Sequence, residues 1–478
     1  MLFNSFQYPV FFTIVFIIYW NLEHKFRWPM LLIASYYFYM SWNAKYVALI
    51  LFTTAVSYAA ALLIERAESV RFKKAVLSVS ALLCLGVLFV FKYFNFFFET
   101  LNAVFARFAI PLHVSTLNLL LPVGISFYTF QTLSYVIDVY RGNCRAERHF
   151  GIYATFVSFF PQLVAGPVER ASNLLPQIKE SRTFDYDQAV YGLKLMAWGY
   201  FKKLAIADVV AIYVDKAYEN LASCTGFDLA AAVFFFTLQI YCDFSGYSDI
   251  AIGTAKLMGI DLMKNFDSPY FSCSVREFWR RWHISLSTWF RDYVYIPLGG
   301  SRCSKLRNYV NLLLTFLVSG LWHGANWTFV FWGGLHGVAQ ILENVAKSAQ
   351  GGGKTGGIVW KMLSILAVFA FCNIAWIFFR APSFSDALYL IRKLALSFTS
   401  LRSFTHTGIG IDKNDLSYLA ICIGVLALYD AASLKTDVIR WLSGKSVVLR
   451  WSIYLALAWL ILIMIPVQGS SEFVYFQF

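Results

Sequence analysis

The chain is a succession of apolar stretches, each about as long as a membrane-spanning helix, separated by short polar loops. Hydrophobic residues make up 59% of the sequence, with a mean hydropathy of +0.59, whereas soluble domains contain about 45–50% apolar residues. A backbone in lipid must satisfy its own hydrogen bonds, so such stretches fold as helices. At about 20 residues per span, the sequence predicts an all-α, polytopic integral membrane protein with about 11–13 transmembrane helices plus re-entrant and interfacial helices.

Basic residues account for the net charge of +13, and they gather in short clusters between the apolar stretches, such as 66–74, 276–281 and 302–307. This distribution is typical of the cytoplasmic loops of a multi-pass protein. We therefore expect no nucleic-acid partner. The same bias predicts that the N-terminus and the tail 468–478 lie outside.

The eight cysteines are scattered singly, several of them in apolar stretches. No CxxC pair and no Cys/His spacing typical of a zinc site is present in the sequence. We expect neither a disulfide framework nor a bound metal.

Three histidines, His283, His323 and His336, lie in or beside apolar segments. An ionisable side chain in hydrocarbon is costly and indicates a function by default, and a neutral imidazole can accept a proton near neutral pH. On one straight helix, 13 residues would turn His336 about 220° away from His323, although Gly333-Gly334 could bend that helix. We therefore expect His323 to be catalytic and His336 to be a tunnel residue or a support for one.

Three further polar residues lie near these histidines or between apolar residues. Asn326, three residues after His323 on the expected helical face, could orient its ring. Asp243 and Asp249 flank Phe244–Ser248. They are either tunnel groups or partners of nearby basic residues, and we favour the second interpretation.

The least membrane-like long segment, 251–307, carries arginines between aromatic residues, among them Arg280, Arg281 and Arg291. One interpretation is an amphipathic surface helix at the membrane interface. The other is a basic vestibule that binds an anionic donor, because the planar guanidinium suits phosphate.

A set of motifs in a fixed order resembles the membrane-bound O-acyltransferase (MBOAT) family, in the bacterial branch of alginate O-acetyltransferases and the teichoic-acid D-alanyltransferase. The matching stretches are Leu121–Gln131, Asp138–Arg141, Pro161–Glu169, Asp243–Asp249, Phe278–His283, Trp289–Tyr293, Trp322–Gly324 and Trp376–Arg380. The resemblance implies an MBOAT-like fold with N-terminal transmembrane helices (1–115), a catalytic core (116–380), and C-terminal transmembrane helices with a tail (381–478). It implies that His323 is the catalytic base and that His283, 40 residues upstream, is a second catalytic group.

The chain ends in Phe473-Val474-Tyr475-Phe476-Gln477-Phe478. Alternating aromatic residues could anchor the tail at the membrane interface. The segment also resembles the FxYF-type tail of this branch, which implies that Tyr475 is an acyl relay.

The resemblance implies an O-acyltransferase in a bacterial cytoplasmic (inner) membrane. It would move acetyl from a cytoplasmic donor, acetyl-CoA, for O-acetylation of an alginate-like exopolysaccharide or peptidoglycan, without a bound cofactor. An SGNH-type O-acetyltransferase in the periplasm or at the surface is the expected partner. The alternatives are D-alanyl transfer from a carrier protein to teichoic acid and, from another class, a polytopic transporter or flippase.

Overall fold

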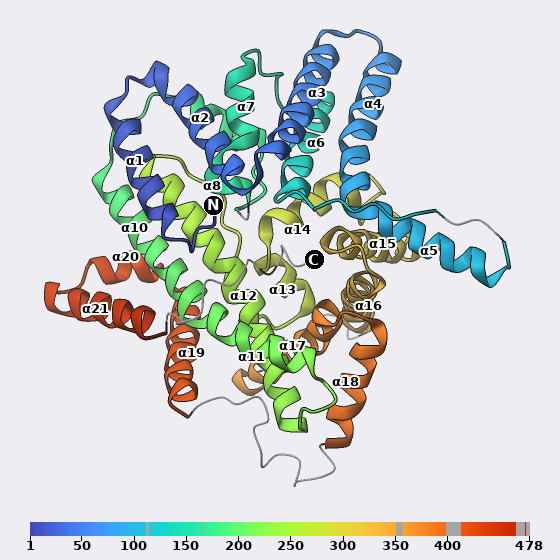
Figure 1. The fold of residues 1–478 in the computed structure, drawn as a ribbon, viewed down its shortest axis with the longest axis vertical. Helices are drawn as coiled ribbons and strands as arrows, with labels where there is room; N and C mark the ends of the chain where they lie inside the picture. Colours follow the sequence, from blue (N-terminus) through green and yellow to red (C-terminus); the bar gives the residue numbers. More distant parts are fainter. Residues whose placement is uncertain (111–113, 165, 350–356, 398–412, 465–473, 475–478) are drawn as a thin grey trace. The chain divides into compact units, whose positions relative to one another are not determined.

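The computed structural model describes residues 1–110, 114–164, 166–349, 357–397, 413–464 and 474. Within these ranges every regular element is a helix, and no strand occurs (Figure 1). The predicted all-α fold is confirmed. The contacts within the chain divide it into unit 1 (1–193 and 251–263) and unit 2 (194–250 and 264–478). The predicted three-part division at 115 and 380 stays a prediction.

Unit 1 is built from the helices of the first half of the chain. They are α1 (Gln7–Asn21), α2 (His24–Asn43), the 3-10 turn η1 (Ala44–Tyr46), α3 (Val47–Arg66), α4 (Val70–Leu88), the π-helical turn η2 (Phe89–Tyr93), α5 (Phe94–Arg107), α6 (Ile125–Arg141), α7 (Phe150–Ser158), α8 (Phe160–Leu163), α9 (Ala171–Lys179) and the first half of α10 (Tyr186–Tyr200).

Small hydroxyl side chains let the helices of unit 1 approach one another. Ser57 of α3 is buried and donates to the carbonyl of Thr53 on its own helix (2.6 Å), while Tyr153 of α7 donates to the Ser57 hydroxyl (2.7 Å). Polar groups in a lipid environment must find such partners within the protein. Figure 1 shows α3 and α4 lying side by side as an antiparallel pair.

Unit 2 contains the remaining helices. They are the end of α10, the π-helical turn η3 (Phe201–Ala207), α11 (Asp208–Glu219), most of α12 (Gly226–Leu257), the 3-10 turn η4 (Pro269–Phe271), α13 (Val275–Arg281), α14 (Ile284–Phe290), the π-helical turn η5 (Arg291–Tyr295), α15 (Lys305–His323), α16 (Trp327–Ala349), α17 (Ile358–Arg380), α18 (Phe384–Ser397), α19 (Lys413–Ser433), α20 (Val438–Ser443) and α21 (Val447–Met464).

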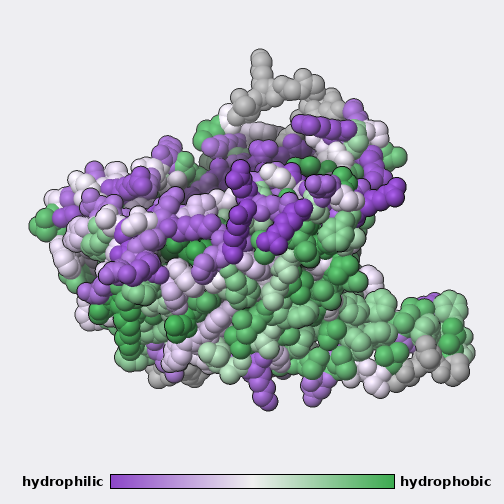
Figure 2. All heavy atoms as spheres, turned by 90° about the horizontal axis from the view of Figure 1, so that it is seen from above, coloured by the Kyte–Doolittle hydropathy of each residue, from purple (hydrophilic) through white to green (hydrophobic). Residues whose placement is uncertain are grey.

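Six helical stretches of the described chain are long and apolar enough to cross a membrane: His24–Arg66, Val70–Arg107, Gly226–Leu257, Ile358–Arg380, Asp415–Ser433 and Val447–Met464. These stretches establish a multi-pass membrane protein, while the number of 11–13 crossings stays a prediction. Figure 2 shows hydrophobic residues covering a large part of the visible surface, as expected of helices that face lipid.

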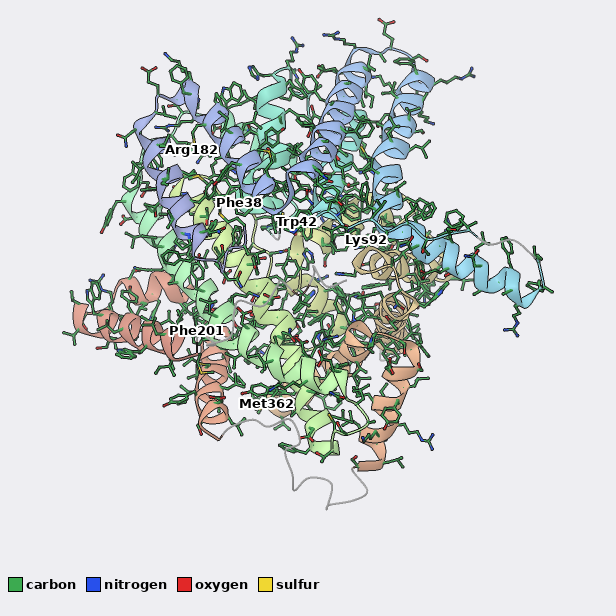
Figure 3. All side chains as sticks on the ribbon, viewed as in Figure 1. Phe38, Trp42, Lys92, Arg182, Phe201 and Met362 are labelled. Carbon is green, nitrogen blue, oxygen red and sulfur yellow. The ribbon has the colours of Figure 1, made fainter. Side chains whose placement is uncertain are left out.

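Helix α17 shows how one helix serves both lipid and core. Its first half exposes Met362 (58%), labelled in Figure 3, whereas Trp376 near its other end is buried. Phe201, also labelled, is fully buried where η3 begins. The apolar content of the sequence therefore divides between a lipid-facing surface and the interior of unit 2.

Helices α15 and α16 form a hairpin in which glycines bring the two backbones into contact. A Cβ atom added to Gly320 would lie 2.3 Å from the carbonyl oxygen of Phe329, and one added to Gly333 would lie 2.2 Å from that of Phe316. Only glycine fits at such distances, as at other close helix crossings in membranes.

We expect Gly333→Ala to push α16 away from α15 and to lower the free energy of unfolding by about 1–3 kcal/mol, the usual cost of overpacking. The thermal unfolding midpoint of the purified protein in detergent measures this. Gly424→Ala in α19 is the control, since its Cβ would meet nothing within 4 Å, and its midpoint should stay level or rise. A Gly333→Ala protein as stable as the parent would show that the hairpin tolerates a wider crossing.

Candidate active site

His323 is the last residue of α15, and it is 3% exposed. The helix ends there because Gly324 takes an extended conformation (φ −157°, ψ 146°), and the ring of Phe329 fills the space that a side chain on Gly324 would need. The imidazole of His323 packs edge-on against Trp332, with ring centroids 5.0 Å apart. A turn therefore fixes this ring among aromatic side chains.

The prediction that Asn326 shares a helical face with His323 is wrong, because α15 ends before Asn326. The Asn326 side chain accepts a hydrogen bond from the backbone N–H of Thr328 (3.0 Å) and donates to the carbonyl of Pro382 (3.2 Å). It caps the start of α16 and ties this turn to residue 382.

His336 lies on α16 and is fully buried. The expectation that it faces away from His323 assumed one straight helix, and the hairpin overturns that assumption. Trp332 lies between the two histidines, with its ring centroid 5.0 Å from each. The indole N–H of Trp279 donates to Nδ1 of His336 (3.2 Å). A neutral His336 therefore carries its proton on Nε2, which makes that nitrogen a donor rather than a base.

His283 precedes α14 and is fully buried, with a left-handed backbone (φ +42°, ψ +55°). This conformation is uncommon for any residue other than glycine, and it marks a position that the surrounding structure constrains. Its Nδ1 lies 3.1 Å from the side-chain oxygen of Asn265. Burial lowers the pKa of His283 to about 3, so the ring is neutral near pH 7.

One aromatic cluster of unit 2 connects His283 with His323. Trp322 packs against both rings, with centroid distances of 6.2 Å to His283 and 5.0 Å to His323. The cluster closes into a loop through Trp332, Trp376, Trp282 and Phe266, each within 6.4 Å of the next ring and the last packed on His283. The structure thus brings together all three histidines that the sequence singles out.

The two aspartates of the sequence analysis pair with adjacent lysines in η3. Asp243 lies 2.7 Å from Lys203, which also contacts Asp208 at 2.7 Å, and all three are buried. Asp249 lies 2.6 Å from Lys202. Both carboxylates therefore have ion-pair partners, and their role in a tunnel stays a prediction.

The predicted relay, Tyr475, lies outside the described residues. Its neighbour Val474 is described and is 2% exposed. The backbone N–H of Val474 donates to the second carboxylate oxygen of Asp243 at 2.7 Å. This bond attaches one position of the C-terminal tail to the interior of unit 2.

The three arginines expected to bind a donor have different surroundings. Arg281 is paired with Glu277 (2.9 Å) and contacts Asp267 (3.7 Å), and Arg291 is paired with Asp292 (2.7 Å). Arg280 is exposed. Arg281 and Arg291 therefore have carboxylate partners, and donor binding by any of the three arginines stays a prediction.

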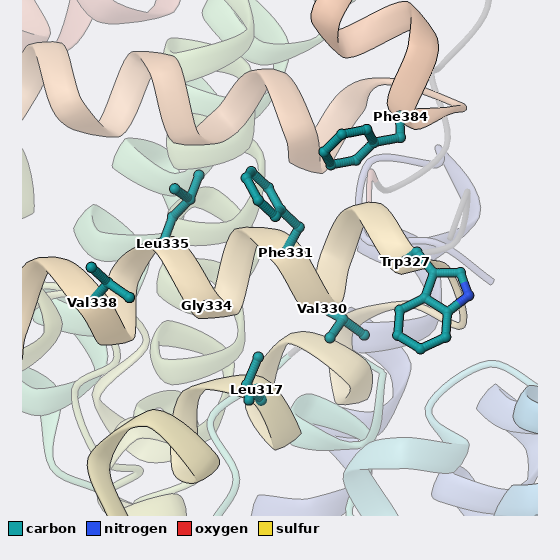
Figure 4. Close-up of a pocket in the computed structure, with 8 residues that line it drawn as sticks. All are labelled: Leu317, Trp327, Val330, Phe331, Gly334, Leu335, Val338 and Phe384. Atoms are coloured by element: carbon teal, nitrogen blue, oxygen red, sulfur yellow. The ribbon is translucent and has the colours of Figure 1, made fainter. Parts of the chain in front are cut away.

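An apolar groove of about 450 Å³ runs along α15, α16 and α18 (Figure 4). Its lining contains no ionisable side chain: Leu317, Trp327, Val330, Phe331, Gly334, Leu335, Val338 and Phe384. None of the three histidines lines it, so we assign it no role in the chemistry. Across the described residues no three His, Cys, Asp or Glu side chains gather as a metal site would require, and the absence of a bound metal stays a prediction.

Sequence reasoning missed Asn265, Trp279 and Trp332. Trp279 lies within a matching motif, and its burial beside His336 was not anticipated. Asn265 pairs with a residue 18 positions away, and no local pattern distinguishes it from a surface asparagine.

A model described as "MBOAT, membrane-bound O-acyltransferase family" matches residues 147–381. The chain is 36% identical over its full length to the full length of a Pseudomonas putida protein named "Probable alginate O-acetylase AlgI". It is 37% identical to a peptidoglycan O-acetyltransferase of Helicobacter pylori, over 76% of this chain and 72% of that protein. It is also 30% identical to a teichoic acid D-alanyltransferase of Streptococcus thermophilus, over 48% of this chain and 58% of that protein.

Proposed function

Because the chain belongs to the membrane-bound O-acyltransferase family, we propose that it transfers acetyl from cytoplasmic acetyl-CoA toward an extracytoplasmic polysaccharide. The observation that carries this proposal is the likeness to O-acetylating relatives along the whole chain, against about half of the chain for the D-alanyltransferase. The proposed acceptor is an alginate-like exopolysaccharide or peptidoglycan. The proposed location is the bacterial cytoplasmic membrane, with an SGNH-type O-acetyltransferase outside it as partner.

In the proposed first step, His323 takes the proton of an acceptor hydroxyl while the hydroxyl oxygen attacks the thioester carbonyl. The carbon–sulfur bond breaks, and the coenzyme thiolate takes the proton back from the imidazolium. The products are an oxygen ester and free coenzyme A. The burial of His323 supports this role, because the rings of Trp322 and Trp332 hold the imidazole in one place inside the protein.

We assign the first acceptor hydroxyl to Tyr475, since a phenol attacks well once a base removes its proton. The bond between Val474 and Asp243 supports this assignment, because it attaches the preceding residue to the unit that holds the three histidines. In the second step the partner enzyme takes the acetyl group from the aryl ester and restores the phenol. His283 is proposed as a second proton acceptor beside the reacting groups.

The donor is tested in membranes that contain the chain and its SGNH-type partner, supplied either with radiolabelled acetyl-CoA or with D-alanine on a carrier protein. We expect only acetyl-CoA to give a labelled product, and mild base should release that label as acetate. Label transferred from D-alanyl carrier protein, with none from acetyl-CoA, would replace this proposal with D-alanyl transfer.

A further inference from the structure

Asn265 lies at the centre of a buried hydrogen-bond cluster that holds His283. Its side-chain oxygen lies 3.1 Å from Nδ1 of His283, 2.9 Å from the Ser285 hydroxyl and 3.3 Å from the Ser285 backbone nitrogen. Its side-chain nitrogen donates to the hydroxyl of Ser248 at 3.1 Å. Asn265 itself is fully buried. One amide group therefore connects α12, the segment before η4 and the start of α14.

The chemistry of these partners fixes the orientation of the amide. A backbone N–H only donates, so the Asn265 atom facing Ser285 is the oxygen. An amide oxygen only accepts, so Nδ1 of His283 carries the proton in that pair. A neutral His283 then has its lone pair on Nε2, the opposite arrangement to the one that Trp279 imposes on His336.

The backbone around Asn265 also contributes. The N–H of Ile284 donates to the carbonyl of Asn265 (2.9 Å), and the N–H of Asp267 donates to the carbonyl of Arg281 (2.9 Å). These bonds hold the segment that carries Asn265 against the segment that carries His283. They also hold His283 in its left-handed conformation.

We propose that Asn265 is the positioning residue of the candidate active site, and that it holds His283 with the proton on Nδ1 so that Nε2 accepts a proton. This inference rests on the proposed function. The two other histidines of the cluster then differ in which ring nitrogen carries the proton. His283 accepts a proton at Nε2, whereas His336 donates from Nε2. For histidines that ligate a metal, loss of the group that orients the ring typically lowers activity about 10–100-fold, and we expect an effect of that size here.

Asn265→Ala should lower kcat by about 10–100-fold and leave KM for acetyl-CoA close to that of the parent, since Asn265 acts through His283 and not through the donor. Asn265→Asp keeps an oxygen facing His283 and Ser285, and the Ser248 hydroxyl can turn to donate to it. We expect Asn265→Asp to recover most of the lost kcat. In a His283→Ala background, Asn265→Ala should cause no further loss, because two residues that act as a unit are non-additive.

Asn373→Ala is the matched control, because Asn373 of α17 in unit 2 makes part-buried hydrogen bonds, to Thr237 (2.9 Å) and Phe369 (2.8 Å), and within the described residues neither bond involves a histidine. Its kcat should stay close to that of the parent, with equal amounts of folded protein in the membrane. Losses from Asn265→Ala and His283→Ala that multiply, or a fully active Asn265→Ala protein beside an inactive His283→Ala protein, would overturn this inference alone. An active His323→Ala protein would instead overturn the proposed function.

Discussion

Replacing His323 with alanine should abolish acetyl transfer while the protein stays folded in the membrane. A general base typically contributes about 10²–10⁴-fold to a rate, and alanine leaves no group at the end of α15 that can take the acceptor's proton. The measurement is ester-linked acetate on the polysaccharide, released by mild base, in cells that carry the variant in place of the parent. We expect the acetate to fall to the level of cells without the protein.

The control for this experiment is His24→Ala. His24 begins α2 in unit 1, and its ring forms a hydrogen bond with the backbone carbonyl of Lys179 (2.8 Å). Its acetate level should match that of the parent. Near-normal acetate in the His323→Ala cells would contradict the acyltransferase mechanism. It would favour a transporter or flippase, which needs no base at this position.

Replacing Tyr475 with phenylalanine should stop acetyl transfer but leave donor binding intact. The change removes only the hydroxyl, so the phenyl ring and the backbone of the tail are kept, including the N–H of Val474 that bonds to Asp243. Without the hydroxyl the acetyl group has no acceptor in the first step. Two measurements check this: polysaccharide acetate, expected to be lost, and acetyl-CoA binding to the purified protein, expected to match the parent.

Tyr418→Phe is the matched control, since this substitution removes the same hydroxyl group outside the candidate site. Tyr418 lies on α19 and is 40% exposed. It should retain parental activity. Parental activity in Tyr475→Phe would exclude the relay and leave a glycan or partner hydroxyl as the direct acceptor. Loss of acetyl-CoA binding in Tyr475→Phe would show that the tail helps to bind the donor rather than to accept the acetyl group.

The sequence predicted the overall architecture correctly where one physical rule dominates. Apolar stretches such as 358–379 must be helical in lipid, and α17 (Ile358–Arg380) reproduces that stretch almost residue for residue. The ends of helices were less predictable. Helix α15 ends where Gly324 becomes extended, with the Phe329 ring in the space that a side chain there would need. A glycine in a helical pattern does not by itself predict such a break.

In the candidate site, too, some features could be predicted from the sequence and others depended on the tertiary structure. An ionisable ring in an apolar stretch is visible in one dimension, so the sequence indicates His323, whereas His283 was singled out by its place in a family motif. The interpretation of Asn326 and His336 depended on whether one helix or two followed residue 323, and the straight-helix assumption misplaced both. Hydrophobic periodicity reports which face of a helix is apolar, and it does not report how two helices fold back on each other.

The sequence by itself determined that this chain is an all-α membrane protein and singled out the histidines proposed for its chemistry, because hydropathy and ionisable residues can be read position by position. The tertiary structure decided what each histidine can do. The hairpin of α15 and α16 places Trp332 between His323 and His336, Asn265 sets the proton of His283, and Asp243 bonds to Val474, 231 positions away. Hydrogen bonds depend on the distance and direction between atoms, and folding sets these between residues that the sequence keeps far apart.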